Sequence, residues 1–277
     1  KNAFYNRLGY SVNLKNPNSF NEKVVWKKIH DRNPLLPIIT DKYQVRSYIK
    51  NLLGGKKAQE ILIPLLYITD KPETIPFDEL PAKYIIKPNN AAGRRIIVED
   101  SIAIDKEDII KTCKRWMKIP YGLAALEWSY IPVKRRIIIE KLLRDDNGKT
   151  PKELKFFMFH GKCKAVYLIL DKLNTPFRSY YDEKWNILPV RKPNRLQGKK
   201  IEKPKNYEEM VMLAEKLSKP FDFLRVDLYN LDGKIWFGEL TNYPYSGKLK
   251  FIPESFDYEL GKYWKIEPEY WKNNNKI

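Results

Sequence analysis

The spacing of hydrophobic residues along the chain predicts several amphipathic helices. A 3.6-residue period indicates helices over residues 20–31, 41–53, 105–118 and 206–219. The first of these begins with a capping box, Ser19 with Glu22, and the second ends at the glycine pair Gly54 and Gly55. Each helix therefore has local signals that agree with its hydrophobic stripe.

Between these helices, short apolar runs predict strands. They cover residues 61–68, 82–88, 134–143, 153–161 and 164–170, followed by a hairpin within 223–241. Helices interrupt the groups of strands, and several neighbouring strands are spaced as hairpins. The pattern predicts an α+β, or mixed α/β, fold class with antiparallel sheets.

The last hairpin, FLRVDLYNLDGKIWFGELT, has one carboxylate on each strand, Asp227 and Glu239. A two-residue Asp-Gly loop would put these acids on opposite faces. A three-residue loop, Leu231 to Gly233, with Gly233 in the left-handed conformation, puts them on one face together with Arg225. Turn chemistry alone does not choose between the loops; we predict the three-residue loop.

A shared face would bring two anions together, which indicates a divalent metal or a cationic ligand beside them. The alternative is an ordinary hairpin in a half-buried sheet. The remaining sequence has to decide between these two interpretations.

Composition and charge narrow the class of protein. The 277 residues, 43% hydrophobic and 13% aromatic, are typical of a globular chain with a sizeable core. There are 52 Lys and Arg against 34 Asp and Glu, a net charge of +18, which attracts nucleic acid, anionic lipid or acidic glycan. The lysines are scattered and no nucleic-acid-binding motif occurs, so specific nucleic-acid binding is not favoured. No apolar run is long enough to span a membrane, and no leader-like segment opens the sequence.

The scarcity of cysteine and histidine excludes several chemistries. Two cysteines, Cys113 and Cys163, form neither a disulfide framework nor a metal set, and a reduced, cytosolic setting is expected. His30 and His160 are the only histidines, which argues against histidine-based acid–base or nucleophilic catalysis.

Three further stretches bear on chemistry. YIIKPNNAAGRRIIV places Lys87 before a loop of small residues, RRIIIEKLLRDDNG places Glu140 at the end of an apolar strand, and ELKFFMFHGK places Lys155 within one. Such residues can hold phosphates and an adenine ring. Taken singly, each is more typical of a turn, an edge charge or a solvated lysine.

Their order along the chain, followed by Arg-x-Asp and Glu-Leu-Thr in the hairpin, resembles the ATP-grasp superfamily. The stretches NLKNPNSFNEKVVWKKIHDRNPLLPIITDKYQVRSYI, YIIKPNN, IIIEKLL, LKFFMFHGK and IEKPKNYEEMVMLAEKLSKPFDFLRVDLYNLDGKIWFGELT are similar to the TupA-like ATP-grasp family, named for teichuronopeptide synthesis. They are spread over residues 8–264. The resemblance implies two α+β subdomains gripping ATP, after a shortened helical N-terminal region. The expected limits are residues 1–58, 59–144 and 145–277.

The resemblance also implies a set of site residues and two cofactors, ATP and Mg²⁺. Nucleotide contacts are assigned to Lys42, Lys87, Asn89, Gly93, Arg94, Arg95, Glu140, Lys141, Leu143, Lys155 and one of Asp145 and Asp146. The metal carboxylates are Asp227 and Glu239, with Thr241 or Asn242 in the position of a third ligand. Catalytic cations are Arg225, Lys155 and Arg178.

The loop NNAAGRR, residues 89–95, departs from the family pattern. Relatives have a glycine-rich lid close to Asn-His-Gly-Ser-Gly-Gly, of which only Gly93 remains, and Arg94 and Arg95 replace small or amide side chains. Fewer glycines restrict the backbone conformations that surround phosphates. Two arginines can supply charge instead.

The implied function is an ATP-dependent carboxylate–amine ligase that forms an amide through an acyl phosphate. The family association suggests joining an amino acid to a uronic acid or acidic residue of a capsular or cell-wall polysaccharide. The expected location is cytoplasmic, with contact to the anionic inner face of the membrane as a candidate. Alternatives are a sugar or glycan kinase on the same fold, and a degenerate polysaccharide-biosynthesis protein with a relict ATP site. No Asp-x-Asp motif supports a nucleotide-sugar glycosyltransferase.

Overall fold

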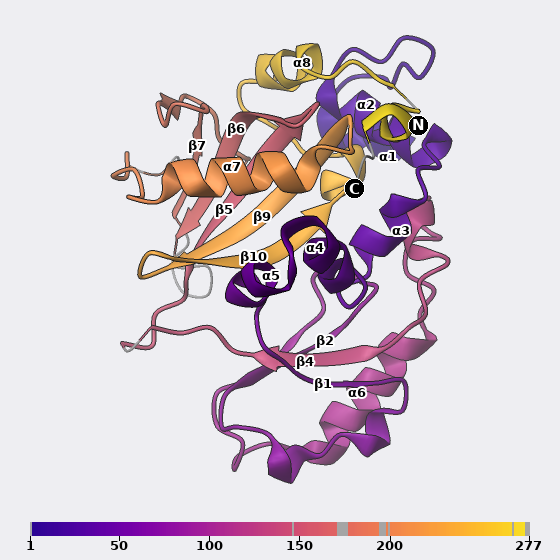
Figure 1. Ribbon diagram of the computed structural model, residues 1–277. Coiled ribbons are helices and arrows are strands. Elements are labelled where there is room, and N and C mark those ends of the chain that lie inside the picture. The colour runs from indigo at the N-terminus through magenta and orange to yellow at the C-terminus, as the bar shows by residue number, and fades with distance from the viewer. Residues whose placement is uncertain are drawn as a thin grey trace. The chain divides into compact units, whose positions relative to one another are not determined.

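The structure is a computed structural model that describes residues 2–145, 147–170, 177–193, 198, 200–267 and 269–274. The chain divides into two units. One unit consists of residues 34–143, and the other combines residues 1–33 with residues 144–277. Each unit contains one antiparallel sheet with its own helices, which confirms the mixed fold class (Figure 1).

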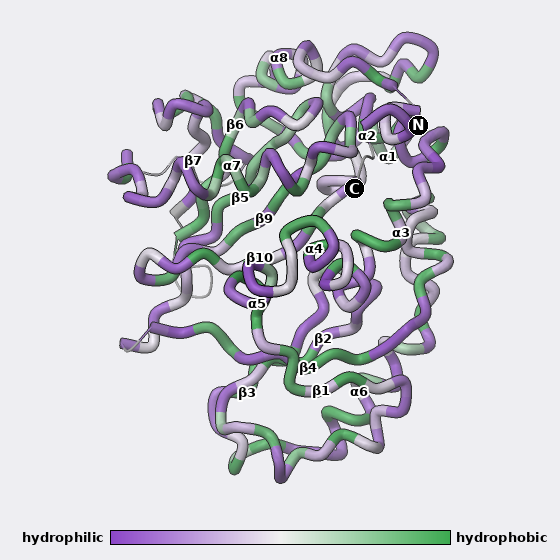
Figure 2. The backbone as a smooth tube through the Cα atoms, in the orientation of Figure 1, coloured by the Kyte–Doolittle hydropathy of each residue, from purple (hydrophilic) through white to green (hydrophobic). Residues whose placement is uncertain are grey.

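The unit of residues 34–143 is built on a four-stranded sheet in the order β1-β4-β2-β3. Its strands are β1 (Leu65–Thr69), β2 (Tyr84–Pro88), β3 (Ile96–Val98) and β4 (Ile137–Lys141). The α6 helix (Lys106–Lys118) packs Ile109 and Cys113 against Tyr84, Ile86 and the isoleucines of β4. Figure 2 shows the hydrophobic run of β4. Cys113 is therefore a core residue, as the helical period predicted.

Three helices precede this sheet in the chain, namely α3 (Leu35–Thr40), α4 (Val45–Leu53) and α5 (Gly55–Ile61). The predicted helix over 41–53 begins only at Val45, because residues 41–44 form turns. Gly54, with φ of 83°, ends α4 as predicted. A new helix, α5, follows at once over residues for which no element had been predicted, and it ends at Ile61, where the predicted strand was to begin.

The other unit is built on a six-stranded sheet in the order β10-β9-β5-β6-β7-β8. The strands are β5 (Lys152–Phe159), β6 (Lys162–Leu170), β7 (Phe177–Tyr181), β8 (Ile187–Leu188), β9 (Phe223–Leu231) and β10 (Lys234–Thr241). The α7 helix (Tyr207–Ser218) crosses one face, where Tyr207 stacks on Phe156 with ring centroids 6.2 Å apart (Figure 1). Strands β7 and β8 were not predicted.

The opposite face of this sheet is apolar at one end and polar at the other. At the apolar end, Phe20 of α2 (Phe20–His30) packs on Phe157, Phe159 and Phe223, with Trp264 closing the cluster. The remaining helices of the unit are α1 (Asn2–Leu8), α8 (Ser255–Lys262) and α9 (Tyr270–Asn274). The polar end carries the candidate site described below.

The structure divides the predicted N-terminal region 1–58 between the two units. The capping box of Ser19 and Glu22 is present and starts α2, as predicted. However, α2 is fixed to the six-stranded sheet, because Phe20 is fully buried and Lys27 forms an ion pair of 2.7 Å with Asp222. Residues 34–58 belong instead to the other unit.

Candidate functional site

The β9–β10 hairpin has a two-residue loop, so the predicted three-residue loop is wrong. Leu231 pairs directly with Lys234, and the loop is Asp232 and Gly233, with φ of 50° and 80°. Positive φ at both positions is the geometry of the tight turn that matches strand twist. The predicted positive φ of Gly233 is confirmed, although it belongs to a different turn.

A β-bulge at Gly238 then restores the predicted shared face. The register shifts between Phe237 and Glu239, so that Asp227 pairs with Glu239. A Cβ atom at Gly238 would lie 2.8 Å from the carbonyl oxygen of Asp227, so this close approach requires glycine. The face shared by the two carboxylates is therefore set by the bulge, not by the loop.

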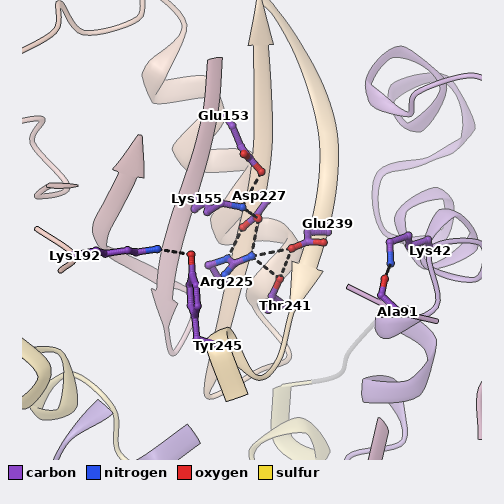
Figure 3. A network of polar contacts seen from close by, with 10 residues as sticks. All are labelled: Lys42, Ala91, Glu153, Lys155, Lys192, Arg225, Asp227, Glu239, Thr241 and Tyr245. Carbon is purple, nitrogen blue, oxygen red and sulfur yellow. Dashed lines mark hydrogen bonds and ion pairs between the residues drawn. The ribbon is translucent and has the colours of Figure 1, made fainter. Parts of the chain in front are cut away.

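Arg225 connects the two carboxylates in the structure. Its Nε and Nη2 donate to the two oxygens of Asp227, at 2.7 and 2.8 Å, and Nη2 also donates to Glu239 at 2.8 Å (Figure 3). The Thr241 hydroxyl accepts from Nη2 at 3.0 Å and donates to Glu239 at 2.9 Å. Among the described residues, the Nη1 nitrogen of Arg225 has no hydrogen-bond partner.

Lys155, on the neighbouring strand β5, is the second cation of the network. It pairs with Asp227 across the strands and donates to both Asp227 and Glu153, the latter at 2.7 Å. Burial raises the pKa of Asp227, and the charges of Arg225 and Lys155 oppose that rise. Burial alone would lower the pKa of Lys155, but the carboxylates, Asp227 foremost, outweigh it and raise the pKa. The pair of anions is thus compensated by the protein's own cations.

The donor set fits Mg²⁺ that arrives with phosphates. Mg²⁺ is commonly held by one or two carboxylates plus substrate phosphates, and Asp227 and Glu239 supply two. The Glu239 side chain keeps 38% of its surface exposed, so it can accept a further partner. In the described part of the chain, no group of three or more His, Cys, Asp and Glu could hold a metal. Of the two residues predicted as a third ligand, Thr241 donates a hydrogen bond to Glu239, and Asn242, the next residue in the chain, is buried.

Sequence reasoning missed a lysine and several tyrosines next to this network. Lys155 pairs across the sheet with Tyr167, which pairs with Tyr180, so these side chains share the face of Asp227. The Lys192 ammonium lies over the rings of Tyr167 and Tyr245, at 4.2 and 4.0 Å from their centroids. Figure 3 shows Lys192 beside Tyr245. The sequence did contain a signal for these tyrosines. In TNYPYSG, Tyr245 follows the β9–β10 hairpin within four residues.

Charge and strain both mark this area. Burial, followed by the charges of Arg225, Lys155 and Arg178, lowers the pKa of Lys192 to about 6. Tyr245 and Ser246 both have positive φ, 51° and 58°, an uncommon backbone conformation for such residues.

Two further features join the predicted Arg178 to this area. Arg178 lies two residues from Tyr180 on the same face of β7. A cation that contacts a phosphate or a substrate would occupy such a position. The buried Tyr180 hydroxyl has no hydrogen-bond partner among the residues that the structure describes. This part of the face thus combines a guanidinium group, a lysine with a lowered pKa and a hydroxyl group that has no partner among the described residues.

A second cluster lies in the unit of residues 34–143. Lys87 on β2 forms an ion pair of 2.5 Å with Glu140 on β4, and Arg46 of α4 approaches the same carboxylate at 3.3 Å. Lys87 and Glu140 had been assigned to the phosphates and the adenine, respectively. The structure brings them together, so a nucleotide that contacts either residue has to replace its partner in this ion pair.

The loop of residues 89–95 is held mainly by Asn89. Its side chain is fully buried, donates to Asp41 at 2.8 Å and to the carbonyl oxygen of Lys134 at 2.9 Å, and accepts from the amide of Arg136. These bonds give Asn89 a positioning role in the loop. The predicted phosphate lysine, Lys42, donates to the carbonyl oxygen of Ala91 at 2.5 Å. The conformation of the loop is therefore coupled to Lys42.

The other predicted loop and linker residues are arranged as follows. Gly93 has φ of 75°, and Arg94 lies over the ring of Tyr121 at 5.8 Å, while Arg95 is exposed. Lys141 is exposed at the end of β4 and Leu143 is buried. Asp145 accepts the amides of Asn147 and Lys149 within its own turn, and Asp146 lies outside the described residues.

The match to a family model identifies the chain as an ATP-grasp protein. The model of the TupA-like ATP-grasp family matches residues 22–265. The chain belongs to this family, as its sequence motifs predicted. A comparison with curated proteins finds no match.

Several solved structures of ATP-grasp ligases are similar to this chain at low sequence identity. D-alanine–D-alanine ligase from Bacillus anthracis, complexed with ATP, is 18% identical with a TM-score of 0.47, covering 86% of this chain and 66% of that one. The Helicobacter pylori enzyme is 15% identical with a TM-score of 0.48, covering 91% and 68%. The ATP-grasp ligase PsnB, complexed with its minimal precursor, is 12% identical with a TM-score of 0.44, covering 86% and 66%. In another Bacillus anthracis D-alanine–D-alanine ligase structure, the chain spans only 57% of the length.

Proposed function

We propose that this protein is an ATP- and Mg²⁺-dependent carboxylate–amine ligase that forms an amide through an acyl phosphate. The observation that carries the proposal is the face shared by Arg225, Asp227 and Glu239 on a bulged hairpin, in a member of the TupA-like ATP-grasp family. A carboxylate and a triphosphate repel each other, and this face combines metal-type carboxylates with buried cations.

Asp227 and Glu239 would hold Mg²⁺ with the phosphates. Bound there, the metal would neutralise charge on the phosphate oxygens during transfer. Arg225 and Lys155 already surround Asp227, so they are placed to offset the same charge from the protein side.

Arg225 has a further role in orienting the acceptor carboxylate. Its Nη1 has no partner among the described residues, while Nε and Nη2 are fixed by Asp227 and Glu239. A guanidinium held on one edge leaves its other edge for a substrate oxygen. Arg178 and the Tyr180 hydroxyl extend this cationic and hydrogen-bonding area, and Lys192 adds an amine whose pKa is lowered to about 6.

The proposed reaction has two steps. A carboxylate oxygen of the acceptor attacks the γ-phosphorus, and the bond to the ADP oxygen breaks, giving an acyl phosphate. The amine then attacks the acyl carbon, inorganic phosphate leaves, and the amine nitrogen gives up a proton. Arg225 would stabilise the oxyanion that forms during the second step. No histidine is required, which suits a chain with two.

The proposed substrates are an amino acid and a uronic acid or acidic residue of a capsular or cell-wall polysaccharide. The family association and the net charge of +18 support this choice, because a cationic surface attracts an acidic glycan precursor. The proposed location is the cytoplasm, at the inner face of the membrane. There the precursor and the anionic lipid surface would both attract the protein.

An ADP-release screen tests the proposal. The purified chain is incubated with Mg²⁺ and ATP and with pairs of amino acids and uronic acids, free or as glycan fragments. We expect ADP and inorganic phosphate in equal amounts, with an amide product found by mass spectrometry. A stable phosphoester without phosphate release would identify a kinase instead. Absence of ADP with every pair would favour the relict-site alternative.

A further inference from the structure

The segment between α6 and β4 exposes only apolar side chains. Within residues 119–132, the side chains open to solvent are Ile119, Pro120, Leu123, Ala124, Leu126, Ile131 and Pro132. Among the described residues, eleven large hydrophobic side chains are exposed, and four of them lie in this segment. The concentration matters because single exposed hydrophobic residues are normal, whereas a group of them marks an interaction surface.

This segment, which we call the docking loop, has a defined conformation. The amide of Leu126 donates to the carbonyl oxygen of Leu123 at 3.1 Å, and the amide of Glu127 donates to that of Gly122 at 2.8 Å. A Cβ atom at Gly122 would lie 2.6 Å from the carbonyl oxygen of Glu127, so the turn closes tightly on glycine. The tip of the turn leaves Leu123 and Leu126 exposed by 50% and 65%.

Leu126 also has a backbone conformation that leucine rarely adopts. Its φ is 56°, in the left-handed region that disfavours side chains with a Cβ atom. This backbone conformation costs free energy, and the exposed Leu126 side chain gains none from burial. A partner that covers Leu126 would supply the missing burial.

Basic residues border the docking loop on both sides. The last turns of α6 expose Lys114, Arg115 and Lys118, and Lys134, Arg135 and Arg136 follow the loop. Lys114 and Lys134 form exposed ion pairs with Glu73 and Asp70, so their charges are partly compensated. The only acid within residues 114–136, Glu127, is 6% exposed.

We propose that the docking loop inserts its apolar tip into the interfacial region of an anionic lipid bilayer, with the basic border on the headgroups. An apolar surface with Lys and Arg around it is the composition of interfacial membrane attachment. Among the residues that the structure describes, no helix is long and apolar enough to cross a membrane. The inference is independent of the proposed reaction, because lipid binding requires neither ATP nor the acceptor.

A vesicle co-sedimentation assay tests the inference. The probes are vesicles of phosphatidylcholine alone and of phosphatidylcholine with phosphatidylglycerol. The test variant combines Leu123→Ser with Leu126→Asn, since asparagine tolerates positive φ and should preserve the turn. The control is Met212→Asn, because Met212 on α7 is 63% exposed, closely matching Leu126.

We expect the wild type and the control to bind the anionic vesicles at low salt, and to bind less at high salt. The double variant should lose affinity at least tenfold while keeping the thermal midpoint of the wild type. A wild type that stays in the supernatant would overturn the inference, as would a double variant that binds equally well. A dimeric wild type that the double variant converts to monomer would also overturn it, because a second copy would then cover the loop.

Discussion

At the scale of single residues, Asp227 holds the site together. Its two carboxylate oxygens accept hydrogen bonds from Arg225 and Lys155, and all three side chains are buried. The sequence predicted that Arg225, Asp227 and Glu239 share one face, and the structure brings the three side chains together. The sequence did not reveal that internal cations already compensate the two acids, since Lys155 comes from a strand 72 residues away.

This compensation changes the expected effect of Asp227→Asn. An amide cannot balance two buried cations, and breaking a buried ion pair costs about 3–5 kcal/mol. We expect Asp227→Asn to lower the free energy of unfolding by an amount of this order, in urea denaturation followed by circular dichroism. It should also abolish turnover. An unchanged free energy of unfolding would contradict the network described here.

Glu239→Gln separates metal binding from folding. Because the Glu239 side chain is 38% exposed, its amide should leave the fold nearly unaffected. We expect its urea midpoint to stay close to that of the wild type, while Mg²⁺-dependent ADP release with an identified acceptor is lost. Near-native ADP release by Glu239→Gln would show that this hairpin has only a structural role.

Lys192 gives a prediction on pH. Its pKa is about 6 in the native protein, whereas a lysine in the unfolded chain keeps its proton up to about pH 10.4. Between these values the unfolded state binds more protons, so the stability conferred by this group rises with pH. Relative to Lys192→Met, the wild type should therefore gain free energy of unfolding from about pH 6 to pH 9. Parallel pH profiles for the two proteins would refute the depressed pKa.

At the scale of elements, the β9–β10 hairpin shows where sequence reasoning succeeded and where it failed. Strand alternation and an assumed three-residue loop led to the correct prediction that one face would hold both acids. They placed the necessary extra residue in the loop, whereas the structure places it at Gly238. A glycine inside an apolar strand was the available signal, because glycine there often marks a bulge.

The bulge predicts different outcomes at two glycines. At Gly238 a Cβ atom would meet the Asp227 carbonyl oxygen at 2.8 Å, so Gly238→Ala should displace Asp227 from Glu239. Gly233 has nothing within 4 Å, and alanine there should cost about 1 kcal/mol through its positive φ alone. We expect ADP release to fall at least tenfold in Gly238→Ala and to stay near wild type in Gly233→Ala. The reverse order would place control of the site in the loop.

Element boundaries were predictable where a side chain caps them. Ser19 and Asp105 accept amides at the starts of α2 and α6, and both starts were predicted to within about one residue. Strands β7 and β8 were not predicted, because they are short, five and two residues, and their own sequences carry little alternation. Lys192 was missed for a different reason, since its partners Tyr167 and Tyr245 are far away in sequence.

At the scale of the whole molecule, the family-assigned residues fall into two clusters, one in each unit. Lys87 and Glu140 pair in the unit of residues 34–143, and Arg225, Asp227 and Glu239 lie in the other. In both clusters, the carboxylates form ion pairs with lysine or arginine side chains of the protein itself. Mg²⁺ alone would have to displace Arg225 or Lys155 from Asp227, whereas phosphates arriving with it would give these cations new partners.

The most direct test of the account is therefore a thermal-shift measurement with ATP, with Mg²⁺, and with both, on the wild type and Glu239→Gln. Because ligands that bind the folded state raise its stability, the wild type should show its largest shift with ATP and Mg²⁺ together, and little shift with Mg²⁺ alone. Glu239→Gln should lose the additional shift that Mg²⁺ gives. Absence of any shift with ATP and Mg²⁺, or an equal shift in Glu239→Gln, would contradict a nucleotide–metal site at Asp227 and Glu239.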